Sequence, residues 1–247
     1  MLPGSPKSKA AHPAIDRVAP AETPSGMVKK PPRRTRERIL ALSLRMFNEI
    51  GEPNVTTSAI ADEMNISPGN LYYHFRNKDD IVNALFEDFE REVDQLLDAA
   101  SSQRATVEDA WLLLHLLFET IWKHRFFYRD LNDLLSRNRR LENFFKQLLS
   151  RKTAAARQLC TALANRGELS ATRSEIDTLA TNMVVVATYW LSFEYVTNAR
   201  RFSDPAFQND AIARGAFQVL SLTGAYLTGP SRELLQGLAT RYLPRPA

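Results

Sequence analysis

The amino-acid sequence predicts an all-α protein, and three features lead to this prediction. No proline occurs between Pro68 and Pro205, and no glycine occurs between Gly69 and Gly167. Because proline and glycine are the residues that most often interrupt helices, such a stretch favours one helix after another. No segment shows the alternation of apolar and polar residues, bounded by hairpin turns, that is typical of strands.

Residues 1–34 are rich in proline, alanine, serine and lysine and have neither a helical nor a strand period, which predicts a disordered leader. Residues 29–38 carry six lysines and arginines against the single acidic residue Glu37, whereas the whole chain has a net charge of only +4. Clustered cations favour DNA or an anionic membrane surface as a partner. A solvated basic tail is the alternative interpretation.

The first helix is predicted to begin near Thr35, which suits the capping position, and to end at Gly51 and Pro53. Apolar residues recur inside it with the spacing of one helical face, which predicts the side that packs on the core. This stripe consists of Ile39, Leu42, Met46, Phe47 and Ile50.

A short second helix is predicted to start after Thr56 or Thr57. A turn at residues 65–66 leads to a third helix, in which Ser67 caps the amino end and Pro68 takes the first position. A fourth helix begins near residue 77 with two aspartates in its first turn, where the helix dipole favours anions. The remaining helices are predicted at about 106–124, 126–137, 139–166, 173–199, 204–227 and 231–242.

Two short helices that are joined by a tight turn and packed on a first helix form a helix-turn-helix unit. In such a unit the amino end of the last helix enters the major groove of DNA. The outward-facing residues of that helix would be Ser67, Gly69, Asn70, Tyr72, Tyr73 and His74.

The segments TTSAIA at residues 56–61 and ISPGNLYYHFRNK at residues 66–78 resemble the DNA-binding domain of the TetR family of bacterial transcription regulators. A weaker resemblance, through RFFYRDL at residues 125–131, is to a subgroup described as bacterial transcriptional repressors. The resemblance implies an N-terminal three-helix helix-turn-helix domain and a C-terminal helical domain for ligand binding and dimerisation. The predicted division is therefore a leader of residues 1–34, a DNA-binding domain of residues 35–82 and a ligand-binding and dimerisation domain of residues 83–247.

The resemblance also implies which residues contact DNA. The opening of the third helix would read base edges, and because Gly69 has no side chain, much of this readout falls to Asn70 and Tyr72, with help from DNA shape. Tyr73, His74 and Lys78 also allow a structural interpretation, as a packed tyrosine and as exposed surface residues. The implied set is Thr57, Ser58, Ser67, Pro68, Gly69, Asn70, Tyr72, Tyr73, His74 and Lys78.

Residues 111–145 are rich in aromatic side chains, which predicts an apolar ligand cavity between the central helices. Aromatic side chains that only fill a core are the alternative. The ligand is expected to be small and largely apolar, with any polar end held by Tyr128, Asn182 or His115. The lining candidates are Trp111, Phe118, Trp122, Tyr128, Met183 and Trp190, joined by Leu114, Phe127, Leu131, Phe144 and Tyr195.

The rest of the sequence offers little chemistry. Cys160 is the only cysteine, which excludes an intramolecular disulfide and a cysteine-based zinc site, and it is interpreted as a buried apolar residue. A spacing of nine residues places His115 and His124 on different faces of a helix, so no metal site or other cofactor is expected. No segment matches a membrane span or a signal peptide, so a cytoplasmic protein is expected. The cations Arg139, Arg140, Arg151 and Lys152 are interpreted as solvated helix faces.

These features predict a homodimeric repressor that binds a palindromic DNA operator and releases it when a small apolar ligand binds. The dimer is expected to form through the helices at about 173–199 and 204–227, where apolar and small residues gather. An all-helical enzyme with a basic leader is the competing hypothesis. It would need a catalytic constellation, and the sequence has no phosphate-binding glycine loop, zinc-protease motif or nucleophile elbow. A regulator that activates, or that works without a ligand, is a third alternative.

Overall fold

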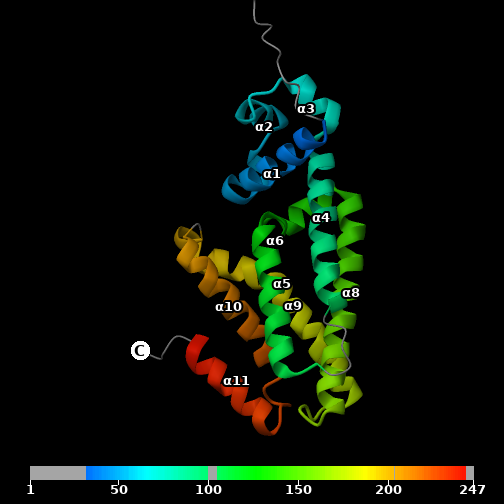
Figure 1. Cartoon of the computed structure of the whole chain (residues 1–247), viewed down its shortest axis with the longest axis vertical. Helices are drawn as coiled ribbons and strands as arrows, with labels where there is room; N and C mark the ends of the chain where they lie inside the picture. The colour runs from blue at the N-terminus through cyan, green and yellow to red at the C-terminus, as the bar shows by residue number, and fades with distance from the viewer. Residues whose placement is uncertain (1–31, 100–104, 203, 243–247) are drawn as a thin grey trace, which may run out of the picture.

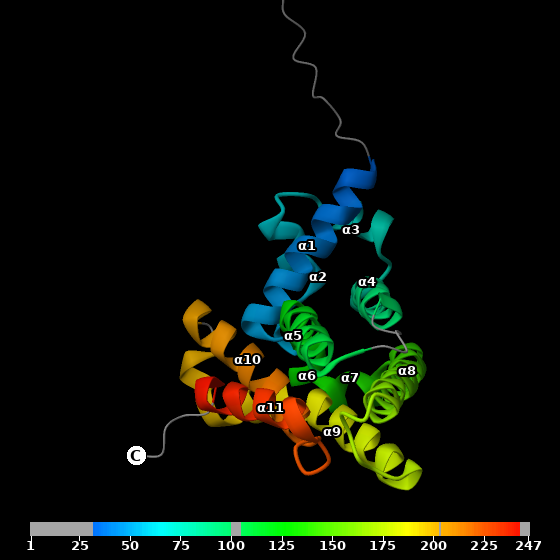
Figure 2. The ribbon, with the colours of Figure 1, turned by 60° about the horizontal axis from the view of Figure 1, so that its bottom comes forward.

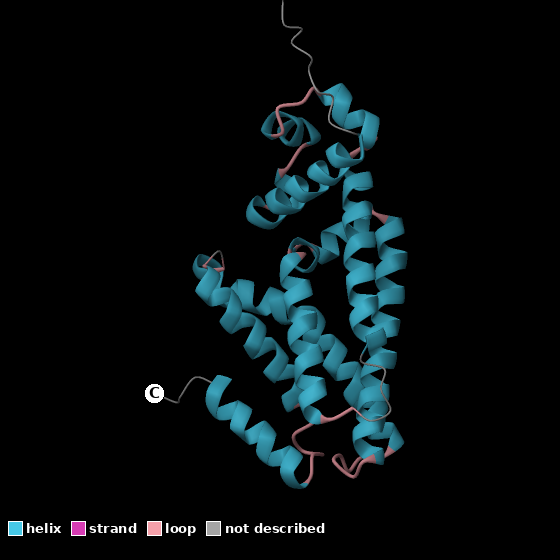
Figure 3. Cartoon of the chain, in the orientation of Figure 1, coloured by secondary structure: helices cyan, strands magenta, loops and turns pink. Residues whose placement is uncertain are grey.

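The computed structural model describes residues 32–99, 105–202 and 204–242, and these residues form helices and no β-strand (Figures 1 and 3). The all-α prediction is therefore confirmed. Leu169 and Leu227 form one isolated antiparallel bridge between two loops. Most of the predicted leader, residues 1–31, lies outside the described residues.

The first three α-helices, α1 to α3, form the predicted helix-turn-helix unit. The elements are α1 (Pro32–Ile50), η1 (Glu52–Asn54), α2 (Thr57–Glu63), α3 (Pro68–His74), α4 (Lys78–Ala99), α5 (Val107–Lys123), α6 (Phe126–Arg129), α7 (Leu131–Arg137), α8 (Arg139–Asn165), α9 (Arg173–Asn198), η2 (Ala199–Arg201), α10 (Pro205–Ser221) and α11 (Gly229–Tyr242).

The molecule is elongated, with α1, α2 and α3 at one end and α11 at the other (Figure 1). The long helix α4 leaves the helix-turn-helix unit and runs beside α8, and α5 packs against α4 on one side and α10 on the other (Figure 2). Helix α9 packs on both α8 and α10, and α11 covers α10. One continuous core of buried apolar side chains extends from α1 to α11.

Three predicted helix boundaries differ from the structure. Helix α1 begins at Pro32 instead of near Thr35, because proline suits the first turn of a helix. The helix predicted at 126–137 is interrupted at Asp130, whose carboxylate faces the backbone N–H of Glu52, the first residue of η1. Helix α10 ends at Ser221, and turns then carry the chain to the bridge at Leu227.

The predicted stripe of α1 is also rotated slightly. Ile39 and Phe47 are buried as expected, with Ser43 between them, whereas Ile50 is exposed. The predicted boundary between residues 82 and 83 falls inside α4, which is continuous and buries Ile81, Val82 and Asn83. Helix α4 thus belongs both to the half of the molecule that contains α1 to α3 and to the larger half that contains α5 to α11. The division into domains remains a prediction.

Candidate DNA interface and ligand cavity

The helix-turn-helix unit is shaped by local side-chain caps. The Thr56 hydroxyl accepts a hydrogen bond from the backbone N–H of Ala59 at the start of α2, and the Ser67 hydroxyl accepts one from Asn70 at the start of α3. Between the two helices Asn65 has a φ of 55°, a left-handed conformation that asparagine tolerates better than most residues. These caps and this turn fix the angle at which α3 leaves α2.

One face of α3 is buried and the other is exposed, as the sequence predicts. Leu71 and the following Phe75 pack in the core with Ile60 of α2. The outward face carries Ser67, Pro68, Gly69, Asn70, Tyr72 and Tyr73 in exposed positions, with His74 half-buried at its end.

Tyr73 is 81% exposed, so it does not pack between helices in this structure. Tyr72 is partly exposed, and its hydroxyl lies 3.1 Å from the Thr57 hydroxyl, which links the amino end of α2 to the middle of α3. Ser58 is exposed beside Thr57. A Cβ added at Gly69 would meet only the Ser67 hydroxyl, at 4.0 Å, so the fold itself does not require glycine there. The exposed row offers hydroxyl, amide and aromatic groups, which are the groups that contact phosphates and base edges.

Lys78 is directed toward the protein interior instead of toward the exposed row. Its ammonium donates hydrogen bonds to the carbonyl oxygens of Glu52, at 2.9 Å, and Val55, at 3.0 Å. The ammonium also lies 3.0 Å from Oε1 of Glu52, and these two groups form an ion pair but not a hydrogen bond. Contact between Lys78 and a phosphate stays a prediction, and the alternative of an exposed surface charge does not describe this inward arrangement either.

Glu52 is fully buried and connects the DNA-binding end to the helices behind it. The Arg137 guanidinium of α7 donates to Oε2 of Glu52, while Lys78 at the start of α4 pairs with Oε1. Nearby, Arg129 of α6 donates to the carbonyl oxygens of Phe47, at 2.8 Å, and Asn48, at 3.3 Å. The α6–α7 segment therefore holds the end of α1 and the start of α4 by charge and hydrogen bonds, as well as by packing.

A small cavity lies between α4, α5, α8 and α9, where the sequence predicts the ligand. Its volume is about 40 Å³, and apart from Lys152 all its lining side chains are apolar. Two of the predicted lining residues, Leu114 and Met183, lie on its wall. Tyr128 does not line the cavity, but its hydroxyl accepts a hydrogen bond from Lys152 Nζ at 2.8 Å. The interpretation of Lys152 as part of a solvated face is wrong, since it is 4% exposed.

Lys152 was identifiable from the spacing of its neighbours. It continues the buried stripe of α8 formed by Leu141, Phe145 and Leu148, at the interval where another apolar residue would be expected. Burial lowers the pKa of the Lys152 ammonium to about 7 and raises the pKa of the Tyr128 hydroxyl. By contrast, Arg151 is partly exposed and pairs with Glu90 and Asp94 of α4.

The other predicted ligand residues pack elsewhere. Phe118 and Trp190 meet Gly215 of α10, where an added Cβ would lie 2.9 Å from Phe118 and 2.6 Å from Trp190. The Trp190 ring N–H donates to the carbonyl oxygen of Ala211, and Trp122 packs on Phe202. Trp111 lies against Tyr242 of α11. These aromatic side chains fill the core in this structure, so their contact with a ligand remains a prediction.

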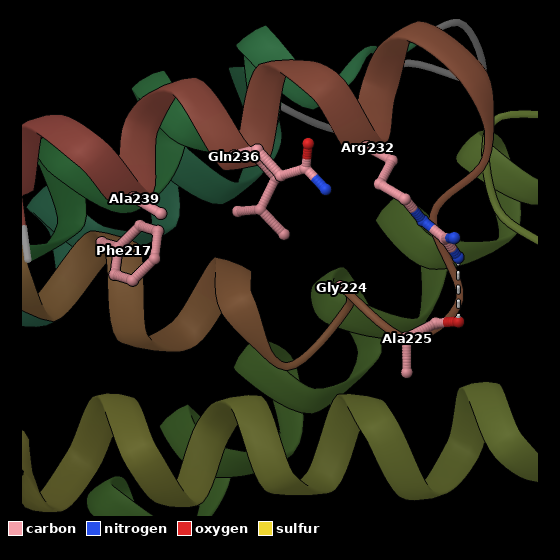
Figure 4. Close-up of a pocket in the computed structure, with 7 residues that line it drawn as sticks. Phe217, Gly224, Ala225, Arg232, Gln236 and Ala239 are labelled. Atoms are coloured by element: carbon pink, nitrogen blue, oxygen red, sulfur yellow. Dashed lines mark hydrogen bonds between the residues drawn. The ribbon is translucent and has the colours of Figure 1, made fainter.

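An open groove of about 460 Å³ lies between α10 and α11 (Figure 4), at the end of the molecule far from α3 (Figure 1). Phe217 and Ala239 lie at one end of it, and at the other Arg232 reaches the carbonyl oxygen of Ala225 at 3.5 Å. None of the predicted ligand residues lines this groove. A ligand there would contact neither α4 nor the α6–α7 segment.

Helix α9 presents an exposed apolar stripe. Val185, Tyr189, Phe193 and Val196 follow one another at intervals of three or four residues and are all exposed. The small residues of α10, by contrast, are buried within the protomer, so the expected close approach there is made to α5 and α9 of the same chain. Of the two helices predicted to form a dimer, α9 alone has a free apolar face among the described residues.

Comparison with known proteins gives matches along most of the chain. The family profile described as "Bacterial regulatory proteins, tetR family" matches residues 39–85, and the profile described as "Bacterial transcriptional repressor" matches residues 88–235. A crystal structure of a TetR-family transcriptional regulator from Marinobacter aquaeolei VT8 is 36% identical, covers 85% of this chain and 99% of that chain, and has a TM-score of 0.76. SmeT, the repressor of the Stenotrophomonas maltophilia multidrug efflux pump SmeDEF, shares the fold at 17% identity, with coverage of 81% and 94% and a TM-score of 0.59.

Among curated proteins, the HTH-type transcriptional repressor KstR2 of Mycolicibacterium smegmatis is 35% identical over 75 residues, which is 29% of this chain and 37% of that protein. The match thus spans little more than a third of the relative's length. Within the described residues, no helix is long and apolar enough to cross a membrane, and no cluster of three His, Cys, Asp or Glu side chains could hold a metal ion.

Proposed function

The chain belongs to the TetR family of bacterial transcriptional regulators, and from this premise we propose that it is a homodimeric repressor that leaves a palindromic operator when a ligand binds between its central helices. The exposed row on α3 carries this proposal, because it combines polar and aromatic groups on a short helix that Leu71 anchors in the core. Members of this family are DNA-binding regulators and not enzymes. We also propose a cytoplasmic location, because a DNA operator would be found there.

Selection from a pool of random DNA duplexes tests the proposal. The selected duplexes are expected to contain an inverted repeat whose half-sites lie about one helical turn, or a multiple of it, apart. Binding should weaken steeply with salt, because phosphate contacts release counterions. Failure to enrich any duplex, or enrichment of a single unrepeated site, would contradict the proposal. Reporter expression with and without the gene separates repression from activation.

Asn70→Ala is expected to change the preference among operator variants, because an amide contact to a base is worth about 1–3 kcal/mol of discrimination. Lys78→Ala is the matched comparison at the start of α4. It should lower affinity for all duplexes alike and also lower thermal stability, since Lys78 holds Glu52 and Val55. Competition binding with paired duplexes measures both effects. Equal changes in preference for the two variants would show that Asn70 does not read the bases.

A ligand can release the operator through α4 and the α6–α7 segment. Helix α4 lines the cavity through Leu97 and begins at Lys78 beside the helix-turn-helix unit. Arg137 and Arg129 tie the α6–α7 segment to Glu52 and to the end of α1. A ligand that binds better when α4 is displaced would favour a different separation of the two recognition helices in the dimer, and so lower operator affinity.

The second protomer is expected to cover the apolar stripe of α9. Val185, Tyr189, Phe193 and Val196 are large apolar residues in one row, and a two-fold axis would place each row against its copy. The same symmetry presents two α3 helices to successive major grooves, which a palindromic operator requires.

Phe193→Glu is expected to convert the dimer to a monomer at micromolar concentration, because it places two like charges in a desolvated interface. Leu112→Glu on α5 is the control, since Leu112 is 57% exposed and Phe193 is 59% exposed. Sedimentation velocity measures the outcome. The interface on α9 would be refuted by a wild-type monomer, or by equal dissociation of both variants.

A further inference from the structure

Lys152 is a buried cation without an acidic partner among the described residues. Its only described hydrogen bond is the one to the Tyr128 hydroxyl, at 2.8 Å. The ring centroids of Tyr128 and Phe89 lie 5.4 and 5.8 Å from its ammonium, which provides weak cation–π stabilisation. Tyr128 is also the one titratable group described within hydrogen-bond distance of it. A buried ammonium with so few partners lowers stability, which makes a role in binding an anion worth testing.

Lys152 is one of the residues that line the cavity between α4, α5, α8 and α9. The cavity's 40 Å³ is enough for a group of the size of a carboxylate or one or two waters. It adjoins a more open groove of about 290 Å³ between α4 and α5, and Leu113 and Leu159 line both spaces. These two side chains therefore form the partition between the outer groove and Lys152.

The charges at the two ends of these spaces determine how a bound molecule would be oriented, with its anionic group inward and its apolar part outward. The outer groove is lined by apolar side chains, among them the exposed Leu112 and Leu116, and by one acidic residue, Asp109. The Asp109 carboxylate repels an anionic group at the outer end, whereas Lys152 attracts one at the inner end. A single cation in a space of this size matches a monoanion better than a phosphate, which is larger and carries more charge.

We propose that the ligand is a monocarboxylic acid with an apolar body, whose carboxylate pairs with Lys152 beside Tyr128 and whose body fills the groove between α4 and α5. This inference rests on the proposed function, because it names the class of ligand for the same regulatory site. In the complex the carboxylate supplies the charge partner that the described part of the chain does not give Lys152, and the apolar body covers Leu112 and Leu116.

The experiment is isothermal titration of the full-length protein, without DNA, with octanoate, decanoate and dodecanoate and with the alcohols of the same lengths. The acids are expected to bind at least about 10-fold more tightly than the matching alcohols, because a hydrogen-bonded charge pair forms only with the acid. Lys152→Met should lower acid affinity about 10-fold or more and remove the preference for acids. Lys146→Met, an exposed lysine on the same helix, should behave as the wild type.

Proton uptake gives a second readout, which a merely structural lysine would not produce. At about pH 8 most of Lys152 is neutral, because burial lowers its pKa to about 7, and pairing with a carboxylate raises that pKa again. Binding should therefore draw a proton from the buffer, and the measured enthalpy should vary with the ionisation enthalpy of the buffer. Lys152→Met should abolish this variation. Tyr128→Phe, which keeps the ring, should weaken acid binding and retain the preference for acids.

The inference is overturned if no acid binds, if alcohols bind as tightly as acids, or if Lys152→Met binds acids like the wild type. These results leave the proposed function standing as long as the protein binds a selected operator. Acid binding that depends on Lys152, in a protein that binds no operator, would instead overturn the proposed function alone.

Discussion

Glu52→Gln is expected to lower the free energy of unfolding by about 3 kcal/mol, an effect well above that of an exposed ion pair. Glu52 is fully buried, and its carboxylate faces Lys78 on one oxygen and Arg137 on the other. Glutamine keeps the shape but removes the negative charge, so Lys78 loses its described ion pair, whereas Arg137 keeps those with Asp133 and Asp79. Both cations retain some access to water, which limits the loss.

Urea unfolding of wild type and variant measures this difference. Glu63→Gln is the control, because Glu63 pairs with Arg45 at the surface, and its change is expected to stay within about 0.5 kcal/mol. Glu52→Gln should also weaken the response of operator binding to ligand, since the link between α7 and the start of α4 is lost. A variant as stable as the wild type would show that packing alone joins the two halves.

The sequence allowed the DNA-binding end of the molecule to be predicted in detail, because its signals are local. Thr56 and Ser67 cap helices through residues three positions away, and Pro68 acts within the same turn. The outward face of α3 likewise follows from helical periodicity once its first residue is known. The same holds for the start of α4, where the Asn77 side chain accepts a hydrogen bond from the backbone N–H of Asp80.

The interior of the larger half could not be predicted in the same way, because its contacts join distant segments. Glu52 lies between a glycine and a proline, and nothing in that position indicates that Arg137, 85 residues later, will reach it. The aromatic residues between 111 and 145 indicate an apolar interior, but which of them border empty space depends on how α5, α8 and α9 meet. Lys152 is an intermediate case. Its place on the buried stripe of α8 could be predicted from the sequence, but its lack of an acidic partner among the described residues could not.

Lys152→Met is expected to raise the free energy of unfolding at neutral pH by about 2–4 kcal/mol, in contrast to most core substitutions. In the folded protein burial lowers the pKa of Lys152 from 10.5 to about 7, whereas in the unfolded chain the lysine keeps its ordinary value. That difference corresponds to a destabilisation of about 5 kcal/mol at most, since one pKa unit is worth about 1.4 kcal/mol. Methionine removes this cost, and the lost hydrogen bond to Tyr128 offsets about 1–2 kcal/mol of the gain.

The pH dependence gives the sharper test. Between about pH 7 and pH 10.5 the unfolded chain binds a proton at Lys152 that the folded protein does not, so this residue makes wild-type stability rise with pH. The advantage of Lys152→Met should therefore be full at pH 7 and below, and it should shrink as the pH approaches 10. Comparing wild type and variant in urea at each pH cancels the groups that titrate in both, and Lys146→Met, at an exposed position, should match the wild type throughout. A variant that is less stable than the wild type at pH 7, or one whose advantage does not change with pH, would contradict the expectation that burial lowers the pKa of Lys152 and destabilises the folded protein.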